Sequence, residues 1–346
     1  MNFLASPSSL TALDDEGWSL LLAEARAADL LSRIAEQINA APCPTMPDKV
    51  RPHIVSARRQ GQSLSLDVKR ELILVADALK SVNTRKILLK GAAYVTADLP
   101  AAQGRIFSDI DLLVSRSHLP DAEGALMLGG WAAAHVDAYD QRYYREWAHE
   151  IPPMTHLQRG TTIDLHHSLV MPTCNIRVDT ERMIGDAVLI PGEGNWFRLR
   201  DEDMVLHAAS HLMLNSEFSH GLRDLGDIDI LLRHFGSTDS NFTDKVKVRA
   251  LEIGLGEIAE QAFTLCRHFY GTRLPQGSRL HRGFLIRLLA NAASTRHPDT
   301  RPYWQLSADL LLLLRELSLR LPPHLLVRHL THKLKVAFST KEPVTP

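Results

Sequence analysis

The segment ILLKGAA at residues 87–93 and the segment RIFSDIDLLV at residues 105–114 decide the fold of this chain. Each contains a short run of branched apolar residues, which is typical of a mostly buried strand. A Lys-Gly pair and a stretch with helical character follow the first run, and the second run carries Asp109 and Asp111. Side chains two positions apart share one face of a strand, so we expect these two carboxylates to project together.

The two segments suggest phosphate chemistry assisted by a metal ion. Two carboxylates held close together repel each other unless a cation lies between them. Mg²⁺ is commonly bound by one or two carboxylates together with substrate phosphates, and two such ions can clamp the oxygens of a phosphoryl displacement. Gly91 would let the backbone approach a phosphate, and the N-terminus of the next helix offers free N–H groups. The alternative is a solvated strand end beside an ordinary turn with an exposed lysine.

The surrounding pattern predicts an α+β fold, with a small mixed sheet and its helices between two helical regions. We expect boundaries near residues 1–85, 86–200 and 201–346. The middle region should contain strands at 86–89, 110–114, 131–135 and 161–169, a hairpin at 188–198, and helices at 91–99 and 118–128. The N-terminal region should be helical through 18–38, with Asp14 or Asp15 as cap, then a linker at 40–52 and a helix at 63–79. The C-terminal region should contain helices at 204–214, 222–235, 251–269, 280–293, 304–319 and from 324 onward.

Composition excludes several classes of protein. Among 346 residues, 39 Lys and Arg balance 40 Asp and Glu, so the net charge of −1 gives no overall attraction to nucleic acid or anionic membrane. The three cysteines are far apart, which argues against a disulfide framework and a cysteine zinc site. The apolar run Leu310–Leu314 is far shorter than the ~20 residues of a membrane span. With no secretory signal pattern at the N-terminus, we expect a cytoplasmic protein.

Two further motifs add a family resemblance. Together with HEIPP at residues 149–153 and IDLH at residues 163–166, the two opening segments resemble an uncharacterised nucleotidyltransferase-like family. That family belongs to the nucleotidyltransferase superfamily with the DNA polymerase beta type fold, and the resemblance covers about residues 85–235. It implies transfer of a nucleoside monophosphate from a nucleoside triphosphate to an acceptor hydroxyl, with Mg²⁺ or Mn²⁺ as cofactor and pyrophosphate as the second product.

The resemblance also implies roles for individual residues. Asp109, Asp111 and Asp164 would be the catalytic, metal-binding carboxylates. The nucleotide would be bound by Lys90, Gly91, Ala92, Arg105 and Ser108, and the substrate cleft would include His149, His166 and Arg223. Most superfamily members have Gly-Gly or Gly-Ser at the turn where this chain has Lys-Gly-Ala, so Lys90 would replace the missing serine as a phosphate contact. The alternative is a catalytically degenerate protein that binds a nucleotide or a partner.

The histidines allow a third hypothesis, a hydrolytic metalloprotein. His207 and His211 have the spacing of two zinc ligands on one helix face, but the glutamate of an HExxH motif is absent. The alternative is that these histidines pack a helix against the sheet or line the cleft.

A second acidic segment lies at residues 223–229, where Arg223 and Asp227 have the spacing of a helical ion pair. Asp227 and Asp229 would point about 200° apart on that helix, so this is not expected to be a second metal site. The pair either stabilises its own helix, which we favour, or anchors the helical region to the cleft.

The last predicted helix is basic, and it either binds nucleic acid or a membrane surface, or is simply solvated. For the acceptor, a small-molecule hydroxyl or a protein side chain is favoured, and the neutral composition argues against long nucleic acid.

Overall fold

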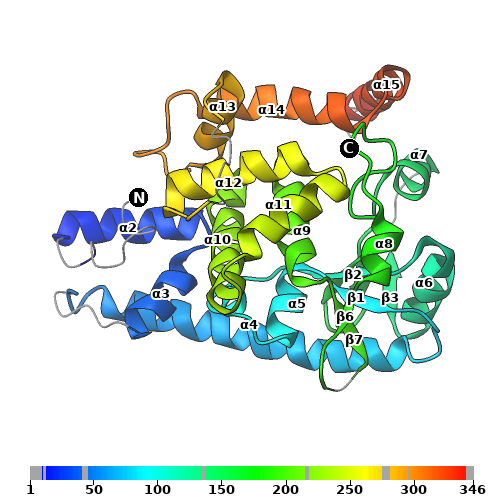
Figure 1. Ribbon diagram of the computed structural model, residues 1–346, viewed down its shortest axis with the longest axis horizontal. Coiled ribbons are helices and arrows are strands. Elements are labelled where there is room, and N and C mark those ends of the chain that lie inside the picture. Colours follow the sequence, from blue (N-terminus) through cyan, green and yellow to red (C-terminus); the bar gives the residue numbers. More distant parts are fainter. Residues whose placement is uncertain are drawn as a thin grey trace, which may run out of the picture.

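The computed structural model combines one mixed sheet with helical regions before and after it in the chain (Figure 1). It describes residues 10, 13–40, 46–133, 138–192, 194–214, 218–274, 281–294 and 296–339, without the side chains of 138 and 333–339. Within these residues the predicted α+β class is confirmed. Cys43, part of the predicted linker, and the C-terminal end from residue 340 lie outside the described residues.

Seven strands of the described chain form the sheet, in the order β3-β4-β5-β2-β1-β7-β6. The strands are β1 Lys86–Leu88, β2 Ile110–Leu113, β3 Trp131–Ala133, β4 Met154–His156, β5 Thr162–His166, β6 Val188–Leu189 and β7 Trp196–Arg198. The pairs β2–β5 and β1–β7 are parallel, and the other neighbours are antiparallel. The predicted strands and the hairpin are therefore present, although residues 134 and 135 of one of them lie outside the described residues. Strand β4 was missed, because three residues after two prolines are too short for a periodic signal.

The N-terminal region contains three helices, α2 Asp15–Ala27, α3 Leu31–Ala40 and α4 Arg51–Ala78. Asp14 caps α2 as predicted, since its side chain accepts a hydrogen bond from the N–H of Gly17 at 2.9 Å. The expectation of helix throughout 18–38 was wrong at one point. Asp29 has a φ of 54°, which ends the helical path and lets α3 start in a new direction.

Helix α4 is longer than predicted, because it begins at Arg51 within the expected linker. Its proline, Pro52, lies in the first turn, where no intrahelical hydrogen bond is lost. The prediction of a linker was therefore wrong at Pro52, which lies in the first turn of a helix.

The helices of the middle region are short. They are α5 Lys90–Thr96, η2 Pro100–Ala102, η3 Arg116–His118, α6 Leu119–Leu128, α7 Ala138–Arg142, the π-helix η4 Tyr143–Trp147 and α8 Thr180–Gly185. Helices α5 and α6 match the two predicted helices of this region. Because α5 follows β1 directly and leads through η2 toward β2, it lies next to the ends of both strands.

The C-terminal region contains α9 Asp201–Leu214, η5 Phe218–His220, α10 Gly221–Thr238, α11 Phe242–Glu252, α12 Gly256–Tyr270, α13 Phe284–Ala293, α14 Gln305–Arg320 and α15 Pro323–Ser339. The helix expected at 251–269 corresponds to α12, but its predicted start was wrong, because Gly254 adopts a φ of 79° and separates α12 from α11. Helix α11 was not predicted. Helix α15 begins close to the predicted position. The side chains of its last lysines lie outside the described residues, so its basic face stays a prediction.

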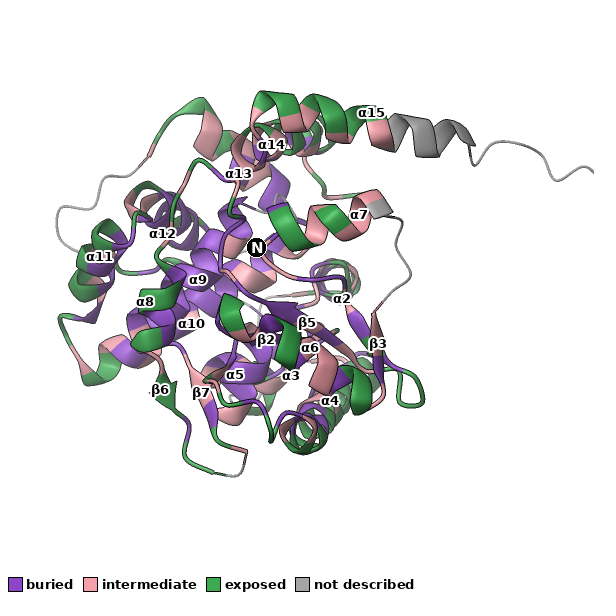
Figure 2. Ribbon diagram, turned by 90° about the vertical axis from the view of Figure 1, so that its right-hand side faces the viewer, coloured by how far each residue is buried: buried purple, intermediate pink, exposed green. Residues whose placement is uncertain are grey.

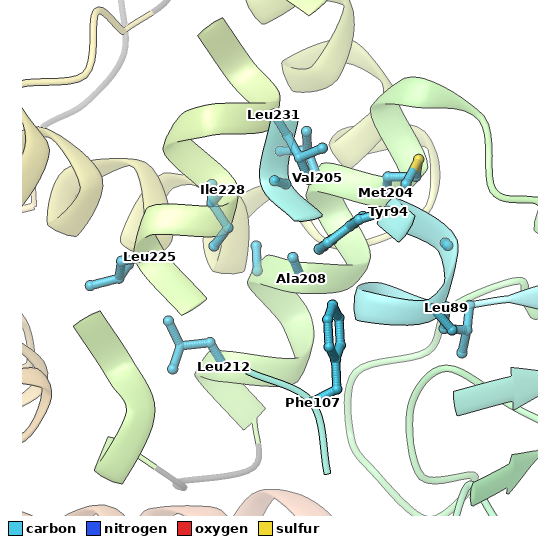
Figure 3. Packing of buried hydrophobic residues seen from close by; sticks show 14 of the residues in the cluster. Leu89, Tyr94, Phe107, Met204, Val205, Ala208, Leu212, Leu225, Ile228 and Leu231 are labelled. Atoms are coloured by element: carbon cyan, nitrogen blue, oxygen red, sulfur yellow. The ribbon is translucent and has the colours of Figure 1, made fainter. Parts of the chain in front are cut away.

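The core is centred on α9 and α10, which lie between the sheet and the outer helices. Nearly all residues of α9 are buried, as expected of a helix covered on every side. Figure 2 shows this buried interior and the largely exposed surfaces of α14 and α15. In Figure 3 the rings of Tyr94 and Phe107 point toward α9, where Ala208 lies. This packing fixes α5 and the segment before β2 against the helical region.

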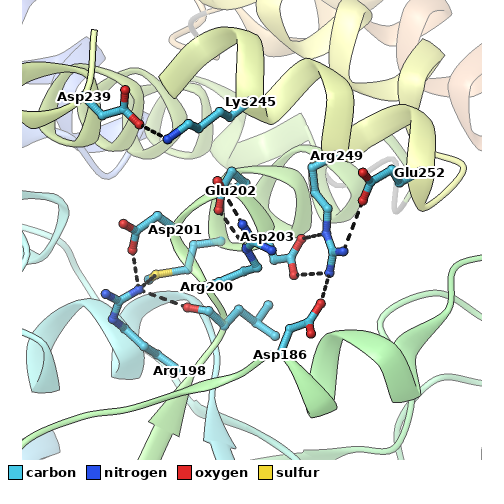
Figure 4. A network of polar contacts seen from close by, with 12 residues as sticks. Asp186, Arg198, Arg200, Asp201, Glu202, Asp203, Asp239, Lys245, Arg249 and Glu252 are labelled. Carbon is cyan, nitrogen blue, oxygen red and sulfur yellow. Dashed lines mark hydrogen bonds and ion pairs between the residues drawn. The ribbon is translucent and has the colours of Figure 1, made fainter. Parts of the chain in front are cut away.

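Ion pairs also hold the helical region to the sheet region (Figure 4). Arg249 of α11 donates to both carboxylate oxygens of Asp203 on α9 at 2.8 Å, and to Asp186, just after α8, at 2.8 Å. Such bidentate contacts set the orientation of both partners. No helix of the described residues is long and apolar enough to cross a membrane.

Candidate active site

A cavity of about 490 Å³ lies where the ends of β2 and β5 meet the helices of the C-terminal region. Its volume is in the range of sites for small molecules and cofactors. The residues that line it are mostly charged or histidine: Asp29, Lys90, Tyr94, Arg105, Ile106, Phe107, Ser108, Asp109, Asp111, His149, Glu150, Asp164, Ala208, His211, His220, Arg223, Asp224, Asp227, Glu316 and Arg320. Most of the residues predicted for the site therefore lie around a single cavity.

The three predicted carboxylates line this cavity together. Strands β2 and β5 are parallel, and Asp111 lies directly opposite Asp164 in the register. Asp109 precedes β2 by one residue and lies on the same side as Asp111, as alternation along the strand predicts. The oxygens of the three aspartates do not, however, all lie within 4.8 Å of one another among the described donors.

Lys90 has a direct partner in Asp111. Its Nζ lies 3.0 Å from Oδ1 of Asp111, and both side chains are largely buried. Burial alone would lower the pKa of Lys90, but the carboxylates of Asp111 and Asp109 outweigh it and raise the pKa. Lys90 also has a φ of 41°, a conformation that costs a residue with a side chain roughly 1–2 kcal/mol. A lysine thus takes a backbone position suited to glycine and directs its ammonium at Asp111.

Gly91 serves packing against the segment before β2. A Cβ atom at this position would lie 2.4 Å from two ring carbons of Phe107 and 2.6 Å from Nη1 of Arg105. Gly91 and Ala92 are buried and are not among the residues that line the cavity. Lys90, Arg105 and Ser108 do line it, so the structure separates the five predicted nucleotide-binding residues into two groups.

Two histidines and a glutamate lie beside the aspartates. Nε2 of His166 lies 3.0 Å from Oδ1 of Asp111 and 3.3 Å from Oε2 of Glu150. Nε2 of His149 lies 3.7 Å from the same glutamate oxygen. We call Asp111, His149, Glu150, Asp164 and His166 the acid–histidine cluster. Within the described residues, His149, Glu150 and His166 are the group whose donor atoms all lie within 4.8 Å of one another.

The electrostatics of this cluster differ from one carboxylate to the next. Burial would raise the pKa of Asp111, but Lys90 and His166 hold it well below its usual value. For Asp164, burial and the negative charges of Glu150 and Asp111 act together and raise the pKa to about 7. Oδ1 of Asp164 is buried and has no hydrogen-bond partner among the described residues. Asp164 is thus the acid of this cluster whose charge is least compensated.

The histidines of the cluster also differ. Burial would lower the pKa of His166, but Glu150 and Asp111 raise it. Burial and the nearby His166 hold the pKa of His149 well below its usual value, so His149 is neutral near pH 7. His149 lines the cavity, and His166 reaches it through Asp111.

A second group of charges adjoins the same cavity. Nε of Arg105 lies 2.7 Å from one oxygen of Asp227, and Nη2 of Arg33 lies 2.6 Å from the other. We call these three residues the arginine–aspartate cluster. It joins the N-terminal helix α3, the segment before β2 and helix α10. Arg105 lines the cavity, where the nucleotide was expected to bind, but its Nε donates a hydrogen bond to Asp227.

The favoured interpretation of Asp227 as the partner of Arg223 in its own helix was therefore wrong. Arg223 contacts Asp224 at 2.9 Å and Asp29 at 3.6 Å. Asp227 instead contacts arginines of other regions. Such contacts join residues far apart in the chain, and sequence spacing does not reveal them. Through Asp227 the segment does contact Arg105 beside the cavity, although not through the expected pair with Arg223. Asp229 faces another direction, as predicted, and pairs with Arg233.

On α9, His207 is buried and His211 is half-buried. Desolvation lowers the pKa of His207 to about 3 and that of His211 well below its usual value. His211 lines the cavity, in agreement with the interpretation that these histidines pack or line the cleft. Glu150 was missed as a site residue, although its position in HEIPP next to His149 was a usable signal. Asp29 and Arg320 were also missed, because they come from distant helical regions without a motif.

Comparison with known families gives one match. Residues 14–271 match a family described as uncharacterised nucleotidyltransferase. The matched part contains the sheet, the acid–histidine cluster and the arginine–aspartate cluster, and it ends before α13. A comparison with curated proteins gives no match.

Proposed function

The chain belongs to this family of uncharacterised nucleotidyltransferases, and we propose that it transfers a nucleoside monophosphate from a nucleoside triphosphate to an acceptor hydroxyl. The oxygen of the acceptor would form a bond to the α-phosphorus while the bond from that phosphorus to pyrophosphate breaks. The observation that carries the proposal is the register of β2 and β5, which sets Asp111 beside Asp164 at a cavity also lined by Asp109.

Dependence on Mg²⁺ or Mn²⁺ is part of the proposal. The unpartnered, buried Oδ1 of Asp164 and its raised pKa are what a carboxylate displays when its surroundings favour an added cation. Asp109, Asp111 and Asp164 would hold the ion or ions, which would neutralise charge on the transferred phosphoryl group. These donors are all carboxylates, which suit hard divalent cations.

The residues of the chain would contribute positioning and charge. Lys90, Arg223 and Arg320 are the cationic side chains of the cavity besides Arg105, and guanidinium groups suit phosphate oxygens. Asp164 would activate the acceptor hydroxyl, either directly or through a metal ion that it holds. Gly91 and Ala92 would act indirectly, by placing Lys90 and Arg105. Most of the rate enhancement would then come from orientation and electrostatics.

The acceptor would be a small molecule or a single protein side chain, because the cavity is small and bounded by several elements. His149 and Arg223, which line the cavity, would contact such an acceptor, and His166 would act on it through Asp111.

Labelling tests the proposal. The full-length protein is incubated with Mg²⁺ or Mn²⁺, an α-labelled nucleoside triphosphate and cell extract as the source of acceptors, and both labelled products and released pyrophosphate are measured. The double variant Asp109→Ala, Asp111→Ala should reduce transfer by about 10³-fold or more. Asp67→Ala is the control, because Asp67 is an exposed acid of α4. Labelling that persists in the double variant would show that these aspartates are not the metal site.

A second candidate is a degenerate protein that binds a nucleotide without transferring it. It is favoured by the state of Lys90, whose ammonium forms an ion pair with Asp111 and whose positive φ is a backbone conformation that favours glycine. Equilibrium dialysis with the same labelled nucleotide separates the two candidates. Metal-dependent binding without any pyrophosphate release in the presence of extract would favour the degenerate protein.

A further inference from the structure

We propose that His149, Glu150 and His166 bind a divalent transition-metal ion of the zinc class, at a site distinct from the one proposed for Asp109, Asp111 and Asp164. This inference does not depend on the proposed transfer reaction, because the ion would bind without nucleotide. Binding would replace the contact between Nε2 of His166 and Oδ1 of Asp111, because the same nitrogen would bind the ion and give up any proton it holds to solvent.

The backbone brings the three residues together. Glu150, which precedes β4, forms an isolated antiparallel bridge with His166, the last residue of β5. On one side the N–H of Ile151 donates to the carbonyl of Leu165 at 3.1 Å, and on the other the N–H of His167 donates to the carbonyl of His149 at 2.9 Å. The donor side chains therefore start from a fixed loop and a sheet strand. Sites built on such fixed elements need little reorganisation to bind an ion.

The separations of the donor atoms fit a tetrahedral ion. With ligand bonds of about 2.0–2.1 Å, donor atoms around such an ion lie about 3.3–3.4 Å apart. Nε2 of His166 and Oε2 of Glu150 are 3.3 Å apart, and Nε2 of His149 is 3.7 Å from the same oxygen. The two imidazole centroids are 5.3 Å apart, close to the roughly 5.2 Å that the same bond lengths and angle give. A small movement of His149 would complete the arrangement.

The charges around the three donors also favour a cation. Two further carboxylates lie beside these donors, because Oδ1 of Asp111 is 3.0 Å from Nε2 of His166 and Asp164 lies directly opposite Asp111 in the sheet. His166 is 1% exposed, while His149 and Glu150 line the cavity, which gives an ion a route from solvent. Two imidazoles and one carboxylate are the ligand set that zinc commonly takes, and imidazole nitrogen favours zinc-class ions over Mg²⁺.

The chain offers a matched control for this set. Nε2 of His281 lies 3.3 Å from Oε2 of Glu260, the same separation as in the His166–Glu150 pair. Within the described residues this pair belongs to no group of three close donors. The metal affinity of the His281–Glu260 pair, which has no third donor nearby among the described residues, can thus be compared with that of the His166–Glu150 pair, which has the second imidazole of His149.

Titration with Co²⁺ tests the proposal on untagged, metal-free, full-length protein without nucleotide. We expect one Co²⁺ per chain with the intense visible absorption of a tetrahedral site, which Zn²⁺ displaces. His149→Gln and Glu150→Gln should each weaken binding at least tenfold, and His281→Gln should leave it unchanged. Asp109→Asn should also leave it unchanged while removing labelled transfer, so a failure of this site and a failure of the transfer reaction are distinguishable.

The wild-type protein supplies a measurement that does not depend on the folding of any variant. X-ray absorption of the zinc-loaded protein should show two imidazole ligands. The proposal is overturned if Co²⁺ gives no tetrahedral spectrum, if fewer than two imidazoles bind zinc, or if folded His149→Gln and Glu150→Gln variants bind Co²⁺ like the wild type.

Discussion

The acid–histidine cluster and the arginine–aspartate cluster both bury charge beside one cavity, but they balance it differently. In the arginine–aspartate cluster both oxygens of Asp227 are occupied, one by Arg33 and one by Arg105. In the acid–histidine cluster Oδ1 of Asp164 has no partner among the described residues, and acidic neighbours surround it. Buried charges are usually paired, so a carboxylate whose two oxygens both have partners is expected in a structural contact. A buried carboxylate oxygen without a partner beside a cavity is expected where a bound ligand supplies the missing contact.

The largest expected effect on stability comes from a substitution in the arginine–aspartate cluster, where both oxygens of Asp227 have partners. Asp227→Asn removes the negative charge between two buried guanidinium groups and should lower the free energy of unfolding by about 3–5 kcal/mol. Urea unfolding followed by circular dichroism measures this loss. Asp77→Asn is the control, because Asp77 and Lys80 form an exposed ion pair whose loss should hardly move the midpoint. If Asp227→Asn leaves the midpoint unchanged, the three-residue contact does not hold the regions together.

A smaller effect is expected where the two clusters meet. Gly91 follows Lys90, which contacts Asp111 of the acid–histidine cluster, and packs against Arg105 of the arginine–aspartate cluster. Gly91→Ala places a methyl group 2.4 Å from Phe107 and should destabilise the protein by about 1–3 kcal/mol through overpacking. Gly124→Ala in α6 meets nothing within 4 Å and should stabilise the helix by about 0.5–1 kcal/mol. Equal thermal shifts of the two variants would contradict the packing role of Gly91.

The sequence predicted the acid–histidine cluster better than the arginine–aspartate cluster, for a physical reason. Asp111 and Asp164 lie in short apolar strands, where alternation and flanking residues fix the direction of each side chain. The contacts of Asp227 join residues 194 and 122 positions apart in the chain, and no local pattern specifies such contacts. The same limit explains the missed Asp29 and Arg320, which reach the cavity only because three regions pack together.

Local geometry set the second limit of prediction. The start of α4 at Pro52, the break at Gly254 and the positive φ of Lys90 each depend on backbone conformation that residue type only partly determines. For Lys90 the sequence suggested a phosphate contact, which stays a prediction. The expected partner was a phosphate, whereas the partner in the structure is Asp111.

The last prediction concerns the acid–histidine cluster. Here removal of the charge of Asp164 should raise the stability of the protein, whereas removal of the charge of Asp227 should lower it. The pKa of Asp164 is about 7 in the folded protein against an ordinary value of 3.8, so between these values the folded chain holds a proton that the unfolded chain has lost. Stability from this group is therefore full below about pH 4 and is lost as the pH rises to about 7. Asp164→Asn should match the wild type near pH 4 and exceed its stability by up to about 4 kcal/mol near pH 7, because each unit of pKa difference corresponds to about 1.4 kcal/mol.

Thermal melts of both proteins from pH 4 to pH 8 in a metal chelator measure this divergence. Mg²⁺ or Mn²⁺ at neutral pH should stabilise the wild type and reduce the difference, because a bound cation compensates the charge that the variant lacks. A variant that is less stable than the wild type at every pH would show that Asp164 is a structural partner like Asp227, and the contrast between the two clusters would then fail.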